Sequence, residues 1–303
     1  MKLNKKMYFV NMGGSMIIDS RKILLGGSFE VSRVLPIKSK RQLGPFVFLD
    51  HMGPHHSAAG QNVDVGAHPH IGLSTLTYLL EGRSVHRDSL GTKMTIEPGD
   101  VNWMTAGHGV SHSERTHVDD LNSEKVFHGL QFWVALPDAL EDCEPHFANY
   151  KKSTIPSLEN SKMKITTVAG EFIGIKSPVI TSSPLVLAHV IAKETSVLEL
   201  SSLKDFEIGV YILAGEVIHG DSKARSGQLL VIDFSKGHQL KLQSGCQAIV
   251  FGGEKLYTEK HIWWNFVSSS KEKISEAENR WRSGLFPMPI EETEPLPAPV
   301  RVN

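Results

Sequence analysis

Short apolar runs recur along most of the chain, and turn-forming Gly, Pro and Asp residues separate them. Runs of this length that are rich in Val, Ile, Leu, Thr and Tyr are typical of strands. Many such strands in series indicate a sandwich or a barrel, so the pattern predicts an all-β fold. The clearest runs are Leu73–Leu80, Lys93–Ile96, Gly129–Leu136, Leu185–Ala192 and Gln228–Phe234.

Helical periodicity is confined to one segment near the end of the chain. Ser269 or Ser270 can cap a short helix over residues 271–282. Beyond it, residues 286–302 are rich in Pro and acidic residues, and we expect an irregular tail there because Pro prevents a long strand or helix. The apolar residues that share one face of the predicted helix are Ile274, Ala277 and Trp281.

An internal repeat becomes visible when the chain is slid against itself by 133 positions. Six identities then fall within one short window, which predicts that the chain holds two tandem small β-barrels. We expect a first domain over residues 1–140 and a second over 141–303, with the polar stretch from Pro137 to Pro156 between the barrels. The identities pair Tyr78, Leu80, Gly82, His86, Asp88 and Ser89 with Tyr211, Leu213, Gly215, His219, Asp221 and Ser222.

Composition narrows the classes of function. The net charge is −1 and no Lys/Arg stripe is present, which disfavours direct binding to nucleic acid. No apolar run is long enough to span a membrane, and the basic residues 1–6 are not followed by the apolar block of a secretory signal. Cys143 and Cys246 lie far apart in sequence, as in a reducing compartment. We therefore expect a cytoplasmic protein. We also expect a monomer, although no single sequence feature requires one.

Histidine is concentrated in the first half of the chain, with nine of 15 within residues 51–117. His68 and His70 are separated by one residue, so on a strand both side chains project from the same face, with Cα atoms about 6.5–7 Å apart. His112 and Glu114 repeat this spacing. An isolated His-x-His is more often a hydrogen-bonded pair than a metal site, but two such pairs in one repeat favour a metal. If the two strands face each other across the barrel, they present three nitrogens and one oxygen to one divalent ion.

Seven motifs, in this order along the chain, resemble the pirin family of the cupin superfamily. One departure is that Ile71-Gly72-Leu73-Ser74 stands where many pirins have Arg-Gly-Phe-Glu, which predicts a different pocket polarity. The motifs are His68-Pro69-His70, Tyr78-Leu79-Leu80-Glu81-Gly82, Pro98-Gly99-Asp100, Trp103-Met104-Thr105-Ala106-Gly107, His112-Ser113-Glu114, Leu130-Gln131-Phe132-Trp133-Val134 with Leu136-Pro137, and Trp263-Trp264-Asn265-Phe266-Val267.

The resemblance implies a jelly-roll bicupin whose N-terminal barrel binds the metal through His68, His70, His112 and Glu114. It favours iron, while the ligand set itself also suits nickel, copper, manganese, cobalt or zinc. The second barrel is expected to hold no metal, because the repeat places Leu240 where the first barrel has His112.

The resemblance also suggests two classes of function. Bacterial pirin-like proteins are associated with quercetinase activity, which predicts a dioxygenase that opens flavonols such as quercetin with O₂. In this scheme Glu114 accepts the proton of the substrate hydroxyl. The mammalian relative is an iron-dependent nuclear cofactor, so the alternative is a redox-sensing protein that modulates a protein partner, such as a transcription regulator or a metabolic enzyme. Metal-dependent isomerisation or hydrolysis is a third hypothesis, without any Ser or Cys nucleophile motif in its favour.

A few other residues are weaker candidates. His86 and Asp88 can form a pair that orients a metal ligand, although the counterpart His219 equally suggests a structural turn. His108 either lines the mouth of the pocket or lies in a solvated loop. His51 follows Asp50, and the two residues either close the pocket or cap a turn.

Overall fold

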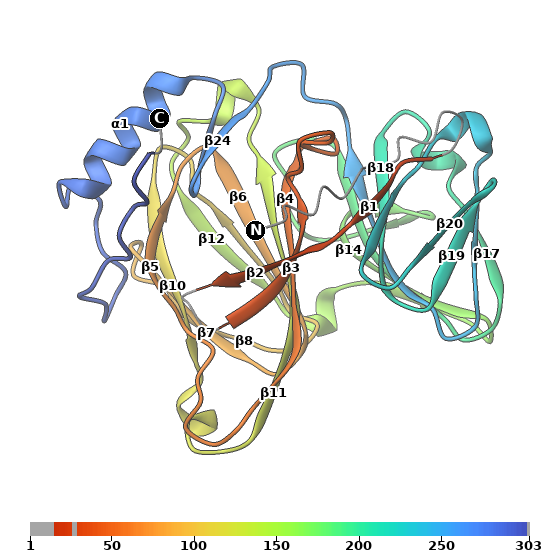
Figure 1. The fold of residues 1–303 in the computed structure, drawn as a ribbon, viewed down its shortest axis with the longest axis horizontal. Helices are drawn as coiled ribbons and strands as arrows, with labels where there is room; N and C mark the ends of the chain where they lie inside the picture. The colour runs from red at the N-terminus through yellow and green to blue at the C-terminus, as the bar shows by residue number, and fades with distance from the viewer. Residues whose placement is uncertain (1–14, 26–28, 302–303) are drawn as a thin grey trace, which may run out of the picture.

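Strands make up nearly all of the regular structure in the computed structural model, which describes residues 15–25 and 29–301 (Figure 1). The strands form two barrels that lie side by side, which confirms the predicted all-β bicupin. No helix in the described part of the chain is long and apolar enough to cross a membrane. The basic residues 1–6 considered above lie outside the described residues.

The first barrel closes a four-stranded sheet over a seven-stranded one. Its strands are β2 (Arg21–Leu25), β3 (Phe29–Leu35), β4 (Phe46–Ser57), β5 (Val65–His70), β6 (Leu73–Glu81), β7 (Ser84–Asp88), β8 (Lys93–Ile96), β9 (Val101–Thr105), β10 (Val110–Thr116), β11 (Lys125–Ala135) and β12 (His146–Tyr150). The seven-stranded sheet has the order β12-β9-β6-β11-β4-β3-β2, and the four-stranded sheet has the order β5-β10-β7-β8.

The second barrel repeats this plan. Its strands are β1 (Ile17–Asp19), β13 (Ser157–Glu159), β14 (Met163–Phe172), β15 (Ile175–Lys176), β16 (Leu185–Ala192), β17 (Ser196–Glu199), β18 (Glu207–Ala214), β19 (Glu216–His219), β20 (Ser222–Arg225), β21 (Gln228–Val231), β22 (Gln239–Leu242) and β23 (Gln247–Gly253). The larger sheet has the order β1-β21-β18-β23-β16-β14-β13, with β15 on β14, and the smaller has the order β17-β22-β19-β20. An apolar cluster that includes Leu240 and Leu242 fills this barrel.

Two strands pair with a different barrel from the one that their position in the sequence suggests. Strand β1 precedes the first barrel in sequence but pairs with β21 of the second, and in Figure 1 the red chain runs from β1 to β2 of the first barrel. Strand β12 lies beyond residue 140 yet pairs with β9 of the first barrel. The domain division after residue 140 stays a prediction, and the pairing of β12 indicates that residues 146–150 pack with the first barrel.

The C-terminal segment also returns to the first barrel. It contains β24 (His261–Trp263), β25 (Phe266–Ser268) and α1 (Lys271–Arg282), and Ser270 caps α1 by accepting a hydrogen bond from the backbone N–H of Lys273. The predicted apolar face of α1 packs in a cluster with Ile71 and Phe266. Ile71, part of the departure from the pirin pattern, is therefore buried beneath α1. Short 3₁₀ turns cover Val118–Asp120, Asp138–Leu140, Lys152–Thr154, Ser201–Leu203 and Phe234–Lys236.

The two large sheets pack face to face through an apolar core, and the repeat is visible there in pairs of His and Tyr residues. Tyr78 and Tyr211 occupy matching positions in the two repeats. The hydroxyl of Tyr211 lies 3.0 Å from Nδ1 of His51, and the hydroxyl of Tyr78 lies 3.5 Å from Nδ1 of His189. Each barrel thus offers one Tyr and one His to the other. His51 belongs to this interface, rather than closing the metal pocket or capping a turn as the sequence suggested.

These buried histidines make the interface sensitive to acid. Loss of hydration lowers the pKa of His51 and of His189 to about 4. In the unfolded chain the same two side chains titrate at ~6.5, so below that pH the unfolded state binds protons that the folded state does not. The free energy of unfolding is therefore highest above pH ~6.5 and falls as the pH is lowered toward 4.

We expect the free energy of unfolding to fall between pH 7 and pH 5 by about 2 kcal/mol for each buried His. His189→Gln should remove its share of this slope, as measured by urea unfolding at the two pH values. His56→Gln, at an exposed position, is the control and should keep the wild-type slope. Equal slopes for His189→Gln and wild type would contradict this assignment.

Candidate metal centre

Three histidines from two neighbouring strands meet inside the first barrel. His68 and His70 project from the same face of β5, as their spacing predicts, and His112 on β10 lies opposite His68 in the antiparallel register. One ring nitrogen from each lies within 4.8 Å of the others, and all three side chains are buried. The expectation that these strands face each other across the barrel is wrong. They are adjacent in one sheet, so the ligands come from one wall.

Backbone carbonyl groups fix the orientation of two of the three rings. Nδ1 of His68 lies 2.8 Å from the carbonyl oxygen of Gly66, and Nδ1 of His70 lies 3.0 Å from that of Asn265. Because a carbonyl oxygen only accepts hydrogen bonds, each Nδ1 must carry the proton. The Nε2 atoms of both neutral rings therefore present lone pairs to the centre of the group.

A second His and a carboxylate fix the orientation of His112. Nε2 of His86 donates to Oδ2 of Asp88 at 2.9 Å, which leaves Nδ1 of His86 as an acceptor, 3.4 Å from Nδ1 of His112. His112 then donates through Nδ1 and keeps a lone pair on Nε2. The repeat counterpart His219 differs, because both of its ring nitrogens lie near backbone carbonyl oxygens of the second barrel. The orienting hypothesis for His86 and Asp88 thus has a geometric basis.

The three imidazoles are suited to a cation. The Nε2 atoms of His70 and His112 are 3.0 Å apart, and by the assignments above neither carries a proton. Two facing lone pairs repel each other unless a positive charge lies between them. Burial lowers the pKa of His68 to about 4 and holds those of His70 and His112 well below the usual value, so all three rings are in the neutral form that binds metals. The donor set therefore fits a transition-metal ion.

Glu114 lies beside the three-histidine group. Its Oε1 is 3.7 Å from Nδ1 of His112, and a bulge in the β5–β10 pairing separates the two residues. Its Oε2 is buried and has no hydrogen-bond partner among the described residues, although 19% of the side chain is exposed. Burial raises the pKa of Glu114 to about 8. A bound cation would give this unpartnered oxygen a partner. The role of Glu114 as fourth ligand stays a prediction.

Two aromatic side chains complete the surroundings on the opposite wall. The ring of Trp133 lies 5.2 Å from that of His70 and stacks on Phe48 with ring centroids 4.0 Å apart. His108 does not take part, because its side chain is exposed and lies 3.3 Å from Glu144. The solvated-loop interpretation of His108 is the one that the geometry supports.

The C-terminal strap, residues 286–299, crosses the outer face of β10 and then pairs with the edge of β5, the two strands that carry the histidines. The backbone N–H of Leu296 donates to the carbonyl oxygen of Ala67 at 2.7 Å, next to His68 in sequence. Pro295 forms a parallel bridge with the same Ala67. The sequence predicted an irregular tail here and gave no reason to place it against the metal-binding strands.

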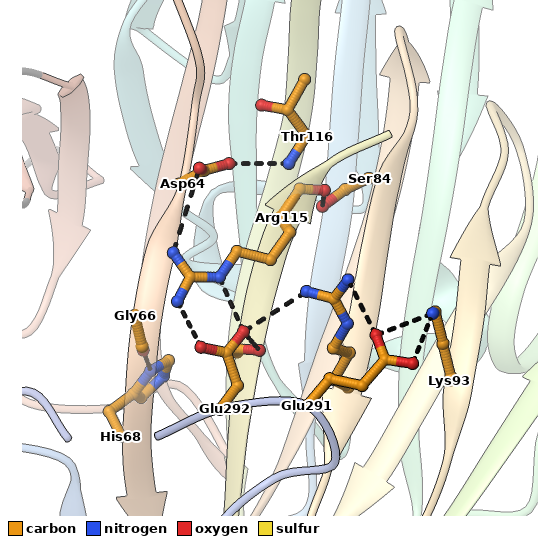
Figure 2. Close-up of polar contacts among 11 residues, drawn as sticks. Asp64, Gly66, His68, Ser84, Lys93, Arg115, Thr116, Glu291 and Glu292 are labelled. Atoms are coloured by element: carbon orange, nitrogen blue, oxygen red, sulfur yellow. Dashed lines mark hydrogen bonds and ion pairs between the residues drawn. The ribbon is translucent and has the colours of Figure 1, made fainter. Parts of the chain in front are cut away.

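Glu292 is the charged anchor of this strap (Figure 2). Its carboxylate accepts hydrogen bonds from Nε of Arg115 at 2.7 Å and from Oγ of Ser113 at 2.9 Å. These two residues flank Glu114, so Glu292 holds the outer face of the strand whose inner face presents His112 and Glu114. The carboxylate is only 7% exposed, which makes the ion pair stronger than a surface pair.

We expect Glu292→Gln to make metal release faster by several-fold, because the strand bearing His112 loses about 1–3 kcal/mol of anchoring. The measurement is the rate of metal transfer to a chelator. Glu291→Gln is a matched control, since Glu291 pairs with Lys93 at the surface, where ion pairs contribute about 0–1 kcal/mol. The same release rate in both variants would show that the strap does not position the site.

Comparisons with known proteins agree with the fold. The family model described as Pirin matches residues 28–134, and that described as Pirin C-terminal cupin domain matches residues 187–287. A pirin-like protein of Caulobacter vibrioides is 40% identical over 288 residues, which cover 94% of this chain and 99% of the relative.

Solved structures extend the likeness. The crystal structure of a quercetin 2,3-dioxygenase from Acinetobacter baumannii matches with a TM-score of 0.87 and 33% identity, covering 96% of this chain and 97% of that one. The bacterial pirin YhhW from Escherichia coli, solved in complex with nickel(II), shares the fold with a TM-score of 0.59 and 18% identity, over 79% of this chain and 99% of that one. The chain therefore belongs to the pirin family.

Proposed function

We propose that the protein is a metal-dependent dioxygenase that opens flavonols such as quercetin with O₂. The observation that carries this proposal is the convergence of three neutral, buried imidazole nitrogens beside an unpartnered carboxylate oxygen inside a barrel. The likeness to the Acinetobacter baumannii quercetin 2,3-dioxygenase supports the choice of reaction. We further propose that the protein acts as a cytoplasmic monomer on a small aromatic substrate.

In this proposal His68, His70, His112 and Glu114 hold one divalent ion, with iron as the first candidate and nickel, copper, manganese, cobalt or zinc as alternatives. Such an ion supplies a Lewis acid that makes a coordinated hydroxyl more acidic, and an open position for O₂ or substrate oxygen. The neutral histidines bind without first losing protons, whereas Glu114, whose pKa burial raises to about 8, must release its proton to serve as the fourth ligand.

The chain's own residues then have separate tasks. Glu114 accepts the proton of the substrate hydroxyl, because its Oε2 is buried, unpartnered and adjacent to the ligand His112. Trp133, which stacks on Phe48, gives the site an apolar wall next to His70, and such a wall suits a planar ring and excludes water from it.

The test is metal analysis of protein purified without added metal, followed by O₂-uptake assays of each metallated form with quercetin. We expect flavonol-dependent O₂ consumption with at least one metal, and none after the metal is removed by a chelator. If the forms loaded with iron, nickel, copper, manganese and cobalt all fail to consume O₂, the dioxygenase proposal is wrong.

A second candidate is a redox-sensing protein that modulates a protein partner. The observation in its favour is Glu292, which connects the outer surface to the strand that bears His112 and Glu114 (Figure 2). A change in the metal's oxidation state would then alter hydrogen exchange in residues 286–299. Equal exchange in the oxidised and reduced forms would remove this candidate.

A further inference from the structure

A row of polar side chains crosses the seven-stranded sheet of the first barrel. Its members lie opposite one another in the registers of six consecutive strands, from β3 to β12. Adjacent residues along these strands, such as Tyr78 and Leu130, pack in the core between the barrels, so the row itself faces the interior of the first barrel. The row consists of Arg33, Asp50, Gln131, Thr77, Asn102 and Asn149.

Hydrogen bonds order the row but do not use all of its polar atoms. Arg33 donates twice to the Asp50 carboxylate, both at 2.8 Å, and Thr77 Oγ1 donates to Oε1 of Gln131 at 2.7 Å. The amide nitrogen of Gln131 makes no hydrogen bond within residues 15–25 and 29–301, and this side chain stays partly exposed although its strand is central in the sheet. A side chain on the inner wall keeps contact with solvent only where side chains do not fill the interior.

Asn102 provides the second unpaired donor of the row. Its Oδ1 accepts a hydrogen bond from Asn149, while its Nδ2 is buried and has no partner among the described residues. Buried polar atoms are almost always paired, and an unpaired one costs about 1–3 kcal/mol. The free amide groups of Asn102 and Gln131 flank Thr77 on the same wall.

The second barrel shows that the fold does not require this row. Tyr211 matches Tyr78 in the repeat, so the residue before each Tyr marks the same place, and Thr77 is replaced by Val210. The strands that flank it are apolar at the same register, and all of these residues belong to the apolar core of that barrel. The corresponding row is Ala188, Val250, Val210 and Leu230.

The polar row lies on the wall opposite the metal-binding strands, and it is one step along that wall from the aromatic residue that contacts His70. Gln131 is two residues from Trp133 on β11, about 6.5–7 Å along the strand, on the same face of the sheet. Trp133 in turn lies against His70 and Phe48. A planar molecule held at the metal and lying against Trp133 would therefore extend toward the polar row with its far end.

We infer that the row centred on Gln131, Thr77 and Asn102 recognises hydroxyl oxygens at the far end of the substrate, so that the first barrel selects polyhydroxylated aromatic molecules over bare ones. This inference rests on the proposed function for the identity of the metal-binding end. Amide N–H groups donate to hydroxyl oxygens, and a site built for such bonds discriminates strongly against an analogue that lacks them.

The test compares two flavonols by quenching of tryptophan fluorescence in the metal-loaded protein. Quercetin carries hydroxyls on its outer rings, while 3-hydroxyflavone keeps only the hydroxyl next to the ketone. We expect wild type to bind quercetin about tenfold or more tightly, and Gln131→Leu to lose this preference while its affinity for 3-hydroxyflavone stays within about twofold. Gln239→Leu, the same change at an exposed position of the second barrel, should behave as wild type.

A second variant shows whether a loss of preference in Gln131→Leu results from misfolding. Thr77→Val keeps the shape of the side chain and removes the hydroxyl that orients Gln131, so we expect it to reduce the preference as well. A preference that survives in both variants overturns the inference, as does a wild type that binds neither flavonol. Quercetin-selective binding that is lost in the variants, without O₂ uptake by wild type, supports the row and rejects the dioxygenase instead.

Discussion

Replacing His70 or His112 by Ala should abolish tight metal binding and leave the fold intact. Each residue supplies one of three converging Nε2 atoms, and two remaining nitrogens cannot enclose the ion. Loss of a residue that merely orients a ligand costs about 10–100-fold in affinity, so loss of a ligand should cost more. The apolar clusters of both barrels do not include these histidines, and the metal-free variants should therefore keep the strand content of wild type.

The measurement is metal content after exhaustive dialysis, with circular dichroism as the check on folding. His56→Ala, an exposed change in the same barrel, should retain full occupancy. We expect one ion per chain in wild type, because Leu240 and Leu242 lie in the apolar core of the second barrel. Full occupancy in the His70 or His112 variant, or two tightly bound ions in wild type, would contradict the assignment.

The alternation of side chains on a strand explains why much of this site could be predicted from the sequence. The spacing of His68 and His70 requires one shared face on any strand, and the structure has them so. The repeat at Tyr78 and Tyr211 predicted two barrels because two segments with the same pattern of strands are expected to fold in the same way. Local spacing did not reveal which strands become neighbours, and this is why β5 and β10 were expected on opposite walls.

Contacts between segments far apart in the sequence could not be predicted from the local spacing of residues. Glu292 lies 177 positions from Arg115, and nothing near either residue indicates that they pair. The polar row likewise depends on contacts between segments that are distant in the sequence. Gln131, Thr77 and Asn102 belong to three separate strands, and their alignment depends on the registers of the sheet. Among the three, only Gln131 lies in a motif quoted for the family resemblance, and the resemblance gave it no role.

Glu114→Gln should separate metal binding from turnover. The amide keeps the shape of the side chain and one oxygen that can act as a ligand, so we expect most of the metal to remain on the three histidines. It cannot accept the proton of the substrate hydroxyl, which removes a contribution of about 10²–10⁴-fold to the rate of general-base catalysis. His112→Ala, in contrast, should lose metal and turnover together.

The measurement is kcat and KM for quercetin-dependent O₂ uptake, normalised to metal content. We expect kcat to fall by about 10²-fold or more in Glu114→Gln with little change in KM, because the proton is transferred in the chemical step rather than on binding. Glu292→Gln, once fully loaded, serves as the control for a change on the same strand that does not touch the substrate, and should keep kcat near the wild-type value. A Glu114→Gln variant that turns over at the wild-type rate would show that another group takes the proton. A variant that loses its metal as completely as His112→Ala would show that Glu114 is needed first as a ligand, and that its unpartnered oxygen serves the ion rather than the substrate.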